Sequence, residues 1–260
     1  MEVTVTKCEE QDCDCDLHYY YDAYTVFVGE HRILTISTAN YITTTRWIKE
    51  VQKTYRHKHG PLIVGVCVDR QSLNFTSNGL EDSPYDLLQL CIGSHCLIYR
   101  FSDPYCYRIP KSLQEFFDDR RVIAVGMDMV SVAKKLERNH EIKVANPMDL
   151  NSMAVKGLRR DDLDLLHYGL NRLARVVLGK HVYVFRPCRY KVEWFQKYDG
   201  GNYNWYNPHL SHEKVKFATS EPYLCYLIGS KLLDMMNCSS SASSSSSKKK
   251  TKKKNSKKKK

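Results

Sequence analysis

Alternating and continuous apolar runs divide the centre of the sequence into strands and helices. Residues 24–28 and 32–37 flank Gly29-Glu30-His31, and this arrangement predicts a β-hairpin. Residues 62–68 form a continuous apolar run, which is typical of a central strand covered on both faces. A second hairpin is predicted from residues 87–92 and 96–101, joined through Gly93-Ser94-His95.

Helical spacing of apolar residues separates these strands. Thr43-Thr44-Thr45 offers N-caps for a helix that carries Trp47, Ile48 and Val51 and ends before Gly60. A helix follows Pro110, residues 122–127 read as a strand, and helices are predicted over 130–138, 161–178 and 213–233. Antiparallel strands followed by strand–helix alternation predict an α/β fold, with a mixed β-sheet flanked by helices on both faces.

The two ends of the chain differ from this centre. We expect residues 1–19 to be a flexible acidic lead, 20–237 to form one domain, and the Ser- and Lys-rich residues 238–260 to be disordered. The lead contains Cys8, Cys13, Cys15 and His18, but their spacing matches no common zinc pattern. A solvated terminal segment is therefore favoured over a metal site there.

Charge is concentrated in the tail. The net charge is +11, and residues 248–260 contain ten lysines and no acid, which leaves +1 for the rest of the chain. No stretch approaches the roughly 18 consecutive apolar residues of a membrane span, and we expect no membrane partner. The acidic N-terminus has no apolar signal-peptide core, so the ten cysteines are expected to be free thiols in a reducing compartment.

Several segments, in their order and spacing, resemble the 3′–5′ exonuclease domain of the DEDD superfamily, particularly the Werner-syndrome type and its small plant members. The resemblance runs over residues 62–233. It is carried by residues 63–69, 88–93, 96–98, 109–117, 125–136, 169–180 and 210–229. It implies a ribonuclease H-like fold and a Mg²⁺- or Mn²⁺-dependent exonuclease that acts on nucleic-acid ends.

In that family four carboxylates hold two metal ions at a phosphodiester, and a Tyr positions the attacking water. Carried over residue by residue, the first motif, Asp-x-Glu, falls on Cys67 and Asp69. The last motif, Tyr-x-x-x-Asp, falls on Phe217 and Glu221. Asp69 and Glu221 are therefore the implied catalytic and metal-binding residues.

The middle Asp of the family falls on Val132 or, counted from the other side, on Val130, and neither valine can bind a metal. Asp128 lies about one helical turn earlier and is a third candidate metal ligand, although a helix N-cap is the favoured interpretation. Cys67 is expected to be an ordinary buried core thiol rather than a ligand or nucleophile. Hard carboxylates suit Mg²⁺ and thiols do not, so catalysis is expected to be weak or lost.

Two further features point to nucleic acid. Tyr203, Trp205 and Tyr206 lie in an aromatic, Gly-containing loop and could stack on unpaired bases, although rings that cover the domain's own surface are the favoured interpretation. Flexible lysines bind polyanions without sequence preference and also serve as nuclear import signals. The tail residues concerned are Lys248, Lys249, Lys250, Lys252, Lys253 and Lys254.

Three functions therefore follow from the sequence. The first is a slow exonuclease on single-stranded DNA or RNA ends, and the second is a non-catalytic nucleic-acid-binding module. The third is a scaffold that forms homo-oligomers or hetero-oligomers with active exonucleases. A nuclear location, with a cytoplasmic one as the alternative, follows from the Lys tail.

Overall fold

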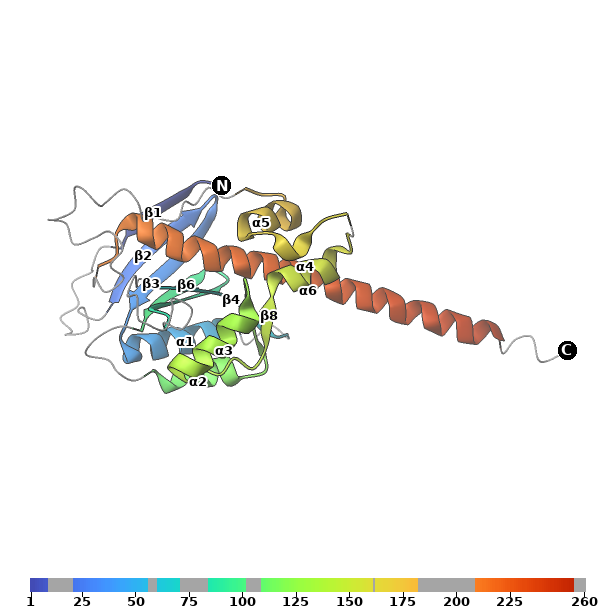
Figure 1. Ribbon diagram of the computed structural model, residues 1–260, viewed down its shortest axis with the longest axis horizontal. Helices are drawn as coiled ribbons and strands as arrows, with labels where there is room; N and C mark the ends of the chain where they lie inside the picture. Colours follow the sequence, from blue (N-terminus) through green and yellow to red (C-terminus); the bar gives the residue numbers. More distant parts are fainter. Residues whose placement is uncertain are drawn as a thin grey trace, which may run out of the picture.

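A mixed β-sheet of eight strands forms the centre of the computed structural model (Figure 1). The structure describes residues 1–8, 21–55, 60–70, 84–101, 109–160, 162–181 and 209–254, with side chains described as far as residue 238. The strand order is β1-β2-β3-β6-β5-β4-β7-β8. The strands are β1 (Val3–Lys7), β2 (Tyr21–Val28), β3 (His31–Thr38), β4 (Leu62–Asp69), β5 (Leu87–Ile92), β6 (His95–Arg100), β7 (Val122–Gly126) and β8 (Pro147–Asp149).

Both predicted hairpins are present, β2–β3 and β5–β6, and both are antiparallel. The sheet is mixed because β3 pairs with β6, β4 with β7, and β7 with β8 in parallel. The remaining pairs, β1–β2 and β4–β5, are antiparallel. The predicted α/β class with a mixed sheet is confirmed.

Helices cover the two faces of the sheet in two groups (Figure 1). One apolar cluster joins the sheet to α4, α5 and α6, and a second joins it to α1, α2 and α3. β4 contributes to both, since Cys67 packs against the first cluster and Val66 belongs to the second. The helices are α1 (Tyr41–Tyr55), α2 (Lys111–Asp118), α3 (Met129–His140), α4 (Leu150–Leu158), α5 (Leu170–Leu178) and α6 (His212–Lys254), with a 3₁₀ turn at Leu165–His167.

The N-terminus differs from the predicted flexible lead. Residues Val3–Lys7 form the edge strand β1, in register with β2 from Val3 opposite Val28 to Lys7 opposite Tyr24. Val3 is buried in the core, so a short Val-Thr-Val-Thr alternation is enough to hold the strand on the sheet. The prediction is therefore wrong for these residues, and residues 9–19 lie outside the described part of the chain.

The region after α3 also differs from its prediction. Instead of one helix over residues 161–178, the described residues contain the 3₁₀ turn and then the shorter helix α5. Gly169 begins α5 in extended backbone, and Gly179 ends it with a φ of 65°, as the sequence indicated for the C-terminus. Neither β8 nor α4 was predicted from the sequence. The sequence feature that could have predicted the start of α4 is its N-cap, Asp149, whose side chain accepts a hydrogen bond from the Ser152 N–H.

The helix N-cap predicted at Thr43-Thr44-Thr45 lies earlier, at Asn40. Its Oδ1 accepts hydrogen bonds from the backbone N–H groups of Ile42 and Thr43, at 2.8 and 3.2 Å. Thr44 and Thr45 lie inside the first turn and donate their hydroxyls back to carbonyls. Asn competes with Thr as an N-cap, and here it satisfies two N–H groups at once.

Helix α6 continues through Lys254, beyond the predicted boundary at residue 238 (Figure 1). Its first half packs across the sheet, whereas its second half extends away from the body. Extending an established helix adds one hydrogen bond for each residue fixed, and lysine is a good helix former. The Ser- and Lys-rich segment from 238 to 254 is thus a continuation of α6. Among the described residues, no helix is long and apolar enough to cross a membrane.

The packing of α6 on the sheet depends on two glycines. A Cβ atom on Gly65 of β4 would lie 1.9 Å from the Pro222 carbonyl oxygen of α6 and 2.6 Å from the Tyr226 nitrogen. A Cβ atom on Gly229 of α6 would lie 2.6 Å from the side chain of Val125 on β7. The backbone of α6 therefore lies directly against the central strands, which is possible only where side chains are absent.

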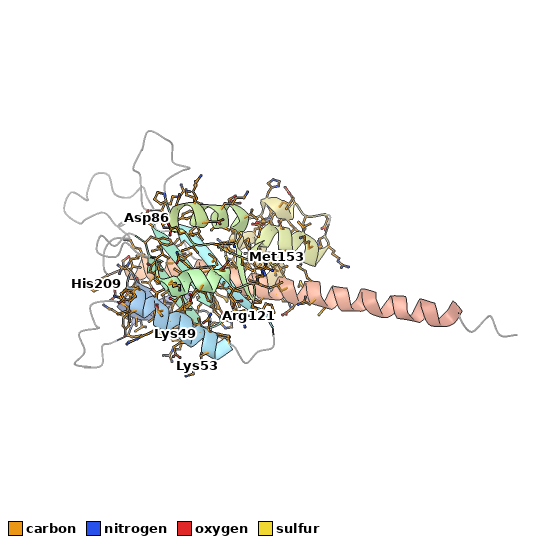
Figure 2. The ribbon with its side chains drawn as sticks, turned by 90° about the horizontal axis from the view of Figure 1, so that it is seen from below. Lys49, Lys53, Asp86, Arg121, Met153 and His209 are labelled. Carbon is orange, nitrogen blue, oxygen red and sulfur yellow. The ribbon has the colours of Figure 1, made fainter. Side chains whose placement is uncertain are left out.

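A buried carboxylate joins the start of α6 to the edge of the sheet. Asp22 of β2 is 6% exposed, accepts a hydrogen bond from His209 at 3.0 Å, and forms an ion pair with Lys7 of β1 at 2.9 Å. His209 lies at the end of the body where α6 begins (Figure 2). Burial of Asp22 opposes ionisation, but the hydrogen bonds and charges of Lys7 and His209 outweigh it and hold its pKa below the usual value.

We expect Gly65→Ala to destabilise the protein by about 3 kcal/mol or more, because the new methyl group meets helix backbone that cannot rotate away. The measurement is urea unfolding followed by circular dichroism. Gly60→Ala is the matched control, since nothing lies within 4 Å of a Cβ atom at that position. Equal unfolding midpoints for the two variants would contradict the close approach of α6 to β4.

We expect Asp22→Asn to lower the free energy of unfolding by about 1–2 kcal/mol at pH 7, because it removes charged hydrogen bonds to two partly exposed partners. The pKa of Asp22 is lower in the folded protein than in the unfolded chain. The ionised carboxylate therefore contributes its full stabilisation above the pKa of the unfolded chain, and this stabilisation is lost as the pH falls through the pKa of the folded protein. The difference between wild type and variant is therefore expected to shrink below about pH 4. Asp162→Asn, in an exposed pair with Arg160, is the control and should change little at any pH.

Candidate functional site

The predicted site residues lie on two elements that pack against each other, β4 and α6. Alternate residues of a strand share a face, so Cys67 and Asp69 follow Gly65 on the face of β4 that meets α6. On α6, Phe217, Glu221 and the following position Cys225 are spaced by four residues and share one helical face. The structure thus brings the first and last predicted motifs to the same interface.

Two thiols are in contact within this interface. The Sγ atoms of Cys67 and Cys225 are 3.7 Å apart, a hydrogen-bonding contact well beyond the roughly 2.05 Å of a disulfide bond. The hydrogen bond with Cys225, then burial, then the charge of Glu221 raise the pKa of the Cys67 thiol well above its usual value. Cys67 is therefore a neutral thiol at physiological pH, at the position where the sequence resemblance leads us to expect a carboxylate.

Asp69 ends β4 as a buried carboxylate. Asp69 is 8% exposed, and its Oδ1 accepts a hydrogen bond from the backbone N–H of Arg70 at 2.8 Å. Its carbonyl accepts a second hydrogen bond from Asp86 N–H, which joins the end of β4 to the start of β5. The carboxylate thus has a fixed position at the end of the strand, next to the face covered by α6.

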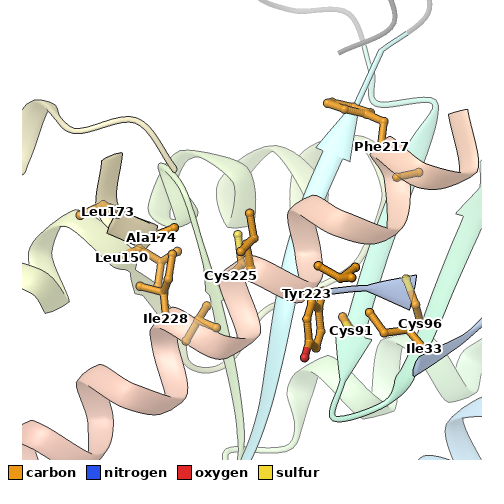
Figure 3. Close-up of a cluster of buried hydrophobic side chains, with 14 of the residues drawn as sticks. Ile33, Cys91, Cys96, Leu150, Leu173, Ala174, Phe217, Tyr223, Cys225 and Ile228 are labelled. Carbon is orange, nitrogen blue, oxygen red and sulfur yellow. The ribbon is translucent and has the colours of Figure 1, made fainter. Parts of the chain in front are cut away.

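Phe217 and Glu221 show how the last motif has changed. The ring of Phe217 is 3% exposed and packs in the cluster beneath α6, so it occupies a core position and offers no hydroxyl to a water molecule (Figure 3). Glu221 is half-buried one turn later, and its charge reaches Cys67. Of this motif, only the carboxylate of Glu221 offers an ionisable group.

The middle motif supplies no polar ligand. Val132 is 9% exposed and packs in the cluster with α1, α2 and α3, whereas Val130 is 50% exposed. Asp128 precedes α3 at the N-cap position with a φ of 48°, is exposed, and makes no side-chain capping bond. It has the N-cap position that the sequence favoured but lacks the expected hydrogen bond.

The donor set does not fit a pair of Mg²⁺ ions. Mg²⁺ takes hard oxygen ligands in near-octahedral geometry, whereas this interface offers two thiols, an aromatic ring and two carboxylates. Among the described residues, no three His, Cys, Asp or Glu side chains are arranged to hold a metal ion. Asp69, Glu221 and Asp128 therefore do not form the three-carboxylate site considered from the sequence.

Other predicted residues lie outside the described part of the chain. These are the three aromatic loop residues and most of the N-terminal Cys and His cluster: Tyr203, Trp205, Tyr206, Cys13, Cys15 and His18. Cys8 is described, and its Sγ lies 3.7 Å from the Thr25 hydroxyl. The lysines of residues 248–254 lie on the backbone of α6.

Cys225 is the functional candidate that sequence reasoning missed. It is fully buried and contacts Cys67 across 158 positions of the sequence. The available signal was its spacing of four residues from Glu221, which places both on one face of the helix. That spacing acquires meaning only once α6 is known to cross β4.

A hollow among the described residues lies at the opposite end of the central strands. It is lined by Leu62 and Val122, which begin β4 and β7, and by Tyr55 and Arg121. Arg121 is engaged with Asp119 at 2.6 Å (Figure 2). The hollow is separated from Asp69 by the length of β4 and does not extend the candidate site.

The fold is shared with solved exonuclease structures. A mutant of the catalytic core of RRP6 from Trypanosoma brucei aligns with 78% of this chain and 48% of its own, at a TM-score of 0.52 and 11% identity. At that identity the alignment establishes the fold alone, and it confirms the ribonuclease H-like architecture.

A second solved structure, the EXD2 exonuclease domain soaked in Mn and Mg, aligns with 76% of this chain and 88% of its own, at a TM-score of 0.40 and 18% identity. No protein-family model matches the sequence, and no curated protein sequence matches it.

We expect Cys67 to react slowly with iodoacetamide at pH 7.5, because its thiol is protonated and packed against Cys225. Cys238 is exposed on α6 and serves as the internal control. Mass spectrometry of proteolytic peptides after timed alkylation measures both rates in one sample. Equal rates at the two cysteines would contradict the packing of the Cys67 thiol against Cys225.

Proposed function

We propose that this chain binds single-stranded ends of nucleic acid through an exonuclease fold and has lost efficient metal-dependent cleavage. The observation that carries the proposal is the contact of Cys67 with Cys225. In the family that the sequence resembles, a metal-bridging carboxylate is expected at the position of Cys67, and a neutral thiol cannot bridge two Mg²⁺ ions. Phe217 lacks the Tyr hydroxyl, and Val130 and Val132 lack the middle carboxylate, so of the family's site only Asp69 and Glu221 keep carboxylates.

Binding to nucleic acid is supported by the fold and by the lysines at its end. The domain without the tail is nearly neutral. Its own contribution to nucleic-acid binding therefore depends on the shape of its surface and on base stacking rather than on charge. Tyr203, Trp205 and Tyr206 are the proposed stacking residues, each worth about 1–3 kcal/mol if a base lies on its ring. The proposed electrostatic contacts are Lys248, Lys249, Lys250, Lys252, Lys253 and Lys254, which bind phosphates with release of counterions.

The alternative function is a slow 3′–5′ exonuclease. It is favoured by the retention of two carboxylates, Asp69 and Glu221, on the two elements that carry the first and last motifs. In this alternative Mg²⁺ or Mn²⁺ would be held by these two residues. A nuclear location, through the same lysines, and assembly with itself or with active exonucleases are further proposals that both functions allow.

Fluorescence anisotropy with a labelled single-stranded DNA and RNA tests binding. We expect binding without sequence preference that weakens as salt rises, because phosphate contacts release counterions. Replacing the six lysines of residues 248–254 by glutamine is expected to reduce the slope of log K against log salt by about 0.7 for each phosphate that a lysine no longer neutralises. The matched control replaces Lys49 and Lys53 on the outer side of α1 (Figure 2). Binding that is equally salt-dependent in the six-lysine variant would contradict a role for the tail.

A cleavage assay tests the loss of catalysis. The full chain is incubated with 5′-labelled single strands in Mg²⁺ or Mn²⁺ beside an Asp69→Asn, Glu221→Gln double variant. We expect no shortening above that of the double variant, because the bridging ligand and the Tyr hydroxyl are absent. Metal-dependent shortening from the 3′ end that disappears in the double variant would instead establish the slow exonuclease.

Restoring the family's missing carboxylates and Tyr hydroxyl tests whether the absence of cleavage comes from the altered site or from an inactive protein preparation. The combined variant Cys67→Asp, Phe217→Tyr and Val132→Asp, with Val130→Asp as the parallel version, supplies the missing carboxylates and the hydroxyl. We expect metal-dependent cleavage to appear in one of the two versions. Because Val132 is buried, circular dichroism must show that the version carrying Val132→Asp is folded.

A further inference from the structure

A run of serines separates the packed half of α6 from its lysines. The run spans residues 239–247 and contains eight serines and one alanine, and the lysine segment, residues 248–254, follows it directly. Both belong to the continuous helix α6, on the half that extends away from the sheet and the other helices (Figure 1). The serines therefore lie between the folded domain and the segment that is proposed to contact phosphates.

The spacing of these serines and lysines matches the turn of the helix. Residues three and four positions apart are neighbours on one face of an α-helix. The last three serines each lie three positions before a lysine, in the pairs Ser245–Lys248, Ser246–Lys249 and Ser247–Lys250. The first three serines, residues 239–241, lie at least seven positions before the first lysine. That separation is about 10 Å along the helix axis, so only the end of the run is close to the lysines.

The lysine segment has no negative charge on its own part of the helix. It carries six lysines, and no acidic residue follows Asp234 in the sequence. Lysines four positions apart on a helix repel each other, as at Lys248 and Lys252. A negative group one turn before the lysines relieves this repulsion, and the order with the acid first and the lysine second is the favourable one.

Phosphorylation of serine supplies such a negative group. A phosphoserine carries a charge of about −1.5 to −2 at pH 7, so three of them nearly cancel the charge of the six lysines. The serine Oγ forms a bond to the γ-phosphorus of ATP while the bond between that phosphorus and the bridging oxygen breaks, and ADP leaves. The hydroxyl proton passes to a base of the protein kinase and then to solvent.

We propose that Ser245, Ser246 and Ser247 are phosphate-acceptor sites for a protein kinase that selects basic residues after the serine, and that their phosphorylation releases nucleic acid from the lysine segment. This inference rests on the proposed binding of nucleic acid by that segment. A lysine lies within three positions after each acceptor. A helix of serine and lysine that extends away from the body is only marginally stable in water, so the run opens readily to enter a kinase.

Phosphorylation of the full chain by a purified kinase of this class tests the acceptor sites. Thr251→Ala and Ser256→Ala are present throughout, because both residues also precede lysines. After incubation with ATP and Mg²⁺, mass spectrometry of peptides is expected to find phosphate on residues 245–247 and none on residues 239–241. A kinase that selects acidic residues is the control. Phosphate spread evenly over the run, no phosphate within it, or an equal yield from the control kinase would overturn the proposal.

Fluorescence anisotropy with a labelled single-stranded DNA tests the release. The triple variant S245D, S246D and S247D is expected to lower the slope of log K against log salt by about 2, because each added negative charge offsets one lysine. The matched control carries the same three changes at residues 239–241. It adds the same charge about one Debye length from the lysines at 0.1 M salt, and it is expected to keep the slope of the parent chain.

The outcomes separate this inference from the proposed function. An unchanged slope in the variant at residues 245–247, with the parent chain still binding the DNA, would overturn the inference alone. An equal loss of slope in both triple variants would also overturn it, because the effect would then belong to total charge rather than to the serines beside the lysines. Failure of the parent chain to bind would overturn the proposed role of the lysine segment, and the release with it.

Discussion

The backbone contact between Gly65 of β4 and Pro222 of α6 determines the rest of the structure. A Cβ atom at Gly65 would lie 1.9 Å from the Pro222 carbonyl, so the helix lies as close to the central strand as two backbones allow. The candidate residues on β4 and α6 are brought together at this contact. It sets Cys67 and Asp69 opposite Glu221 and Cys225, and it gives two thiols from distant parts of the chain a separation of 3.7 Å.

The interface of β4 and α6 combines side chains with different preferences for metal ions. One strand and one helix bring together two thiols in contact, a buried phenyl ring and two carboxylates. Thiols and hard carboxylates select different cations. The proposed loss of Mg²⁺-dependent cleavage thus follows from the thiols and the phenyl ring that lie beside the two carboxylates.

Much of this arrangement was predictable from the sequence, and the exceptions have physical reasons. The apolar run of β4 and the two hairpins were clear because buried strands have a strong local pattern. β1 was missed because five residues on an acidic segment gain their stability only by pairing with β2. The helix predicted over 161–178 was wrong because Gly169 interrupts it, and the end of α6 was misplaced because serine and lysine carry no stop signal.

The candidate site was only partly predictable for a related reason. Cys67, Asp69, Phe217 and Glu221 follow from motif spacing, which is local. Cys225 becomes relevant only through the crossing of α6 over β4, which depends on contacts 158 residues apart in the sequence.

The central claim is that the interface of β4 and α6 no longer holds the metal ions of an exonuclease. Anomalous X-ray diffraction from crystals soaked in Mn²⁺ tests this claim most directly, because Mn²⁺ substitutes for Mg²⁺ at oxygen sites and is located by its own signal. The account predicts no manganese peak between Cys67, Asp69 and Glu221. One or two peaks bound by Asp69 and Glu221 would contradict it.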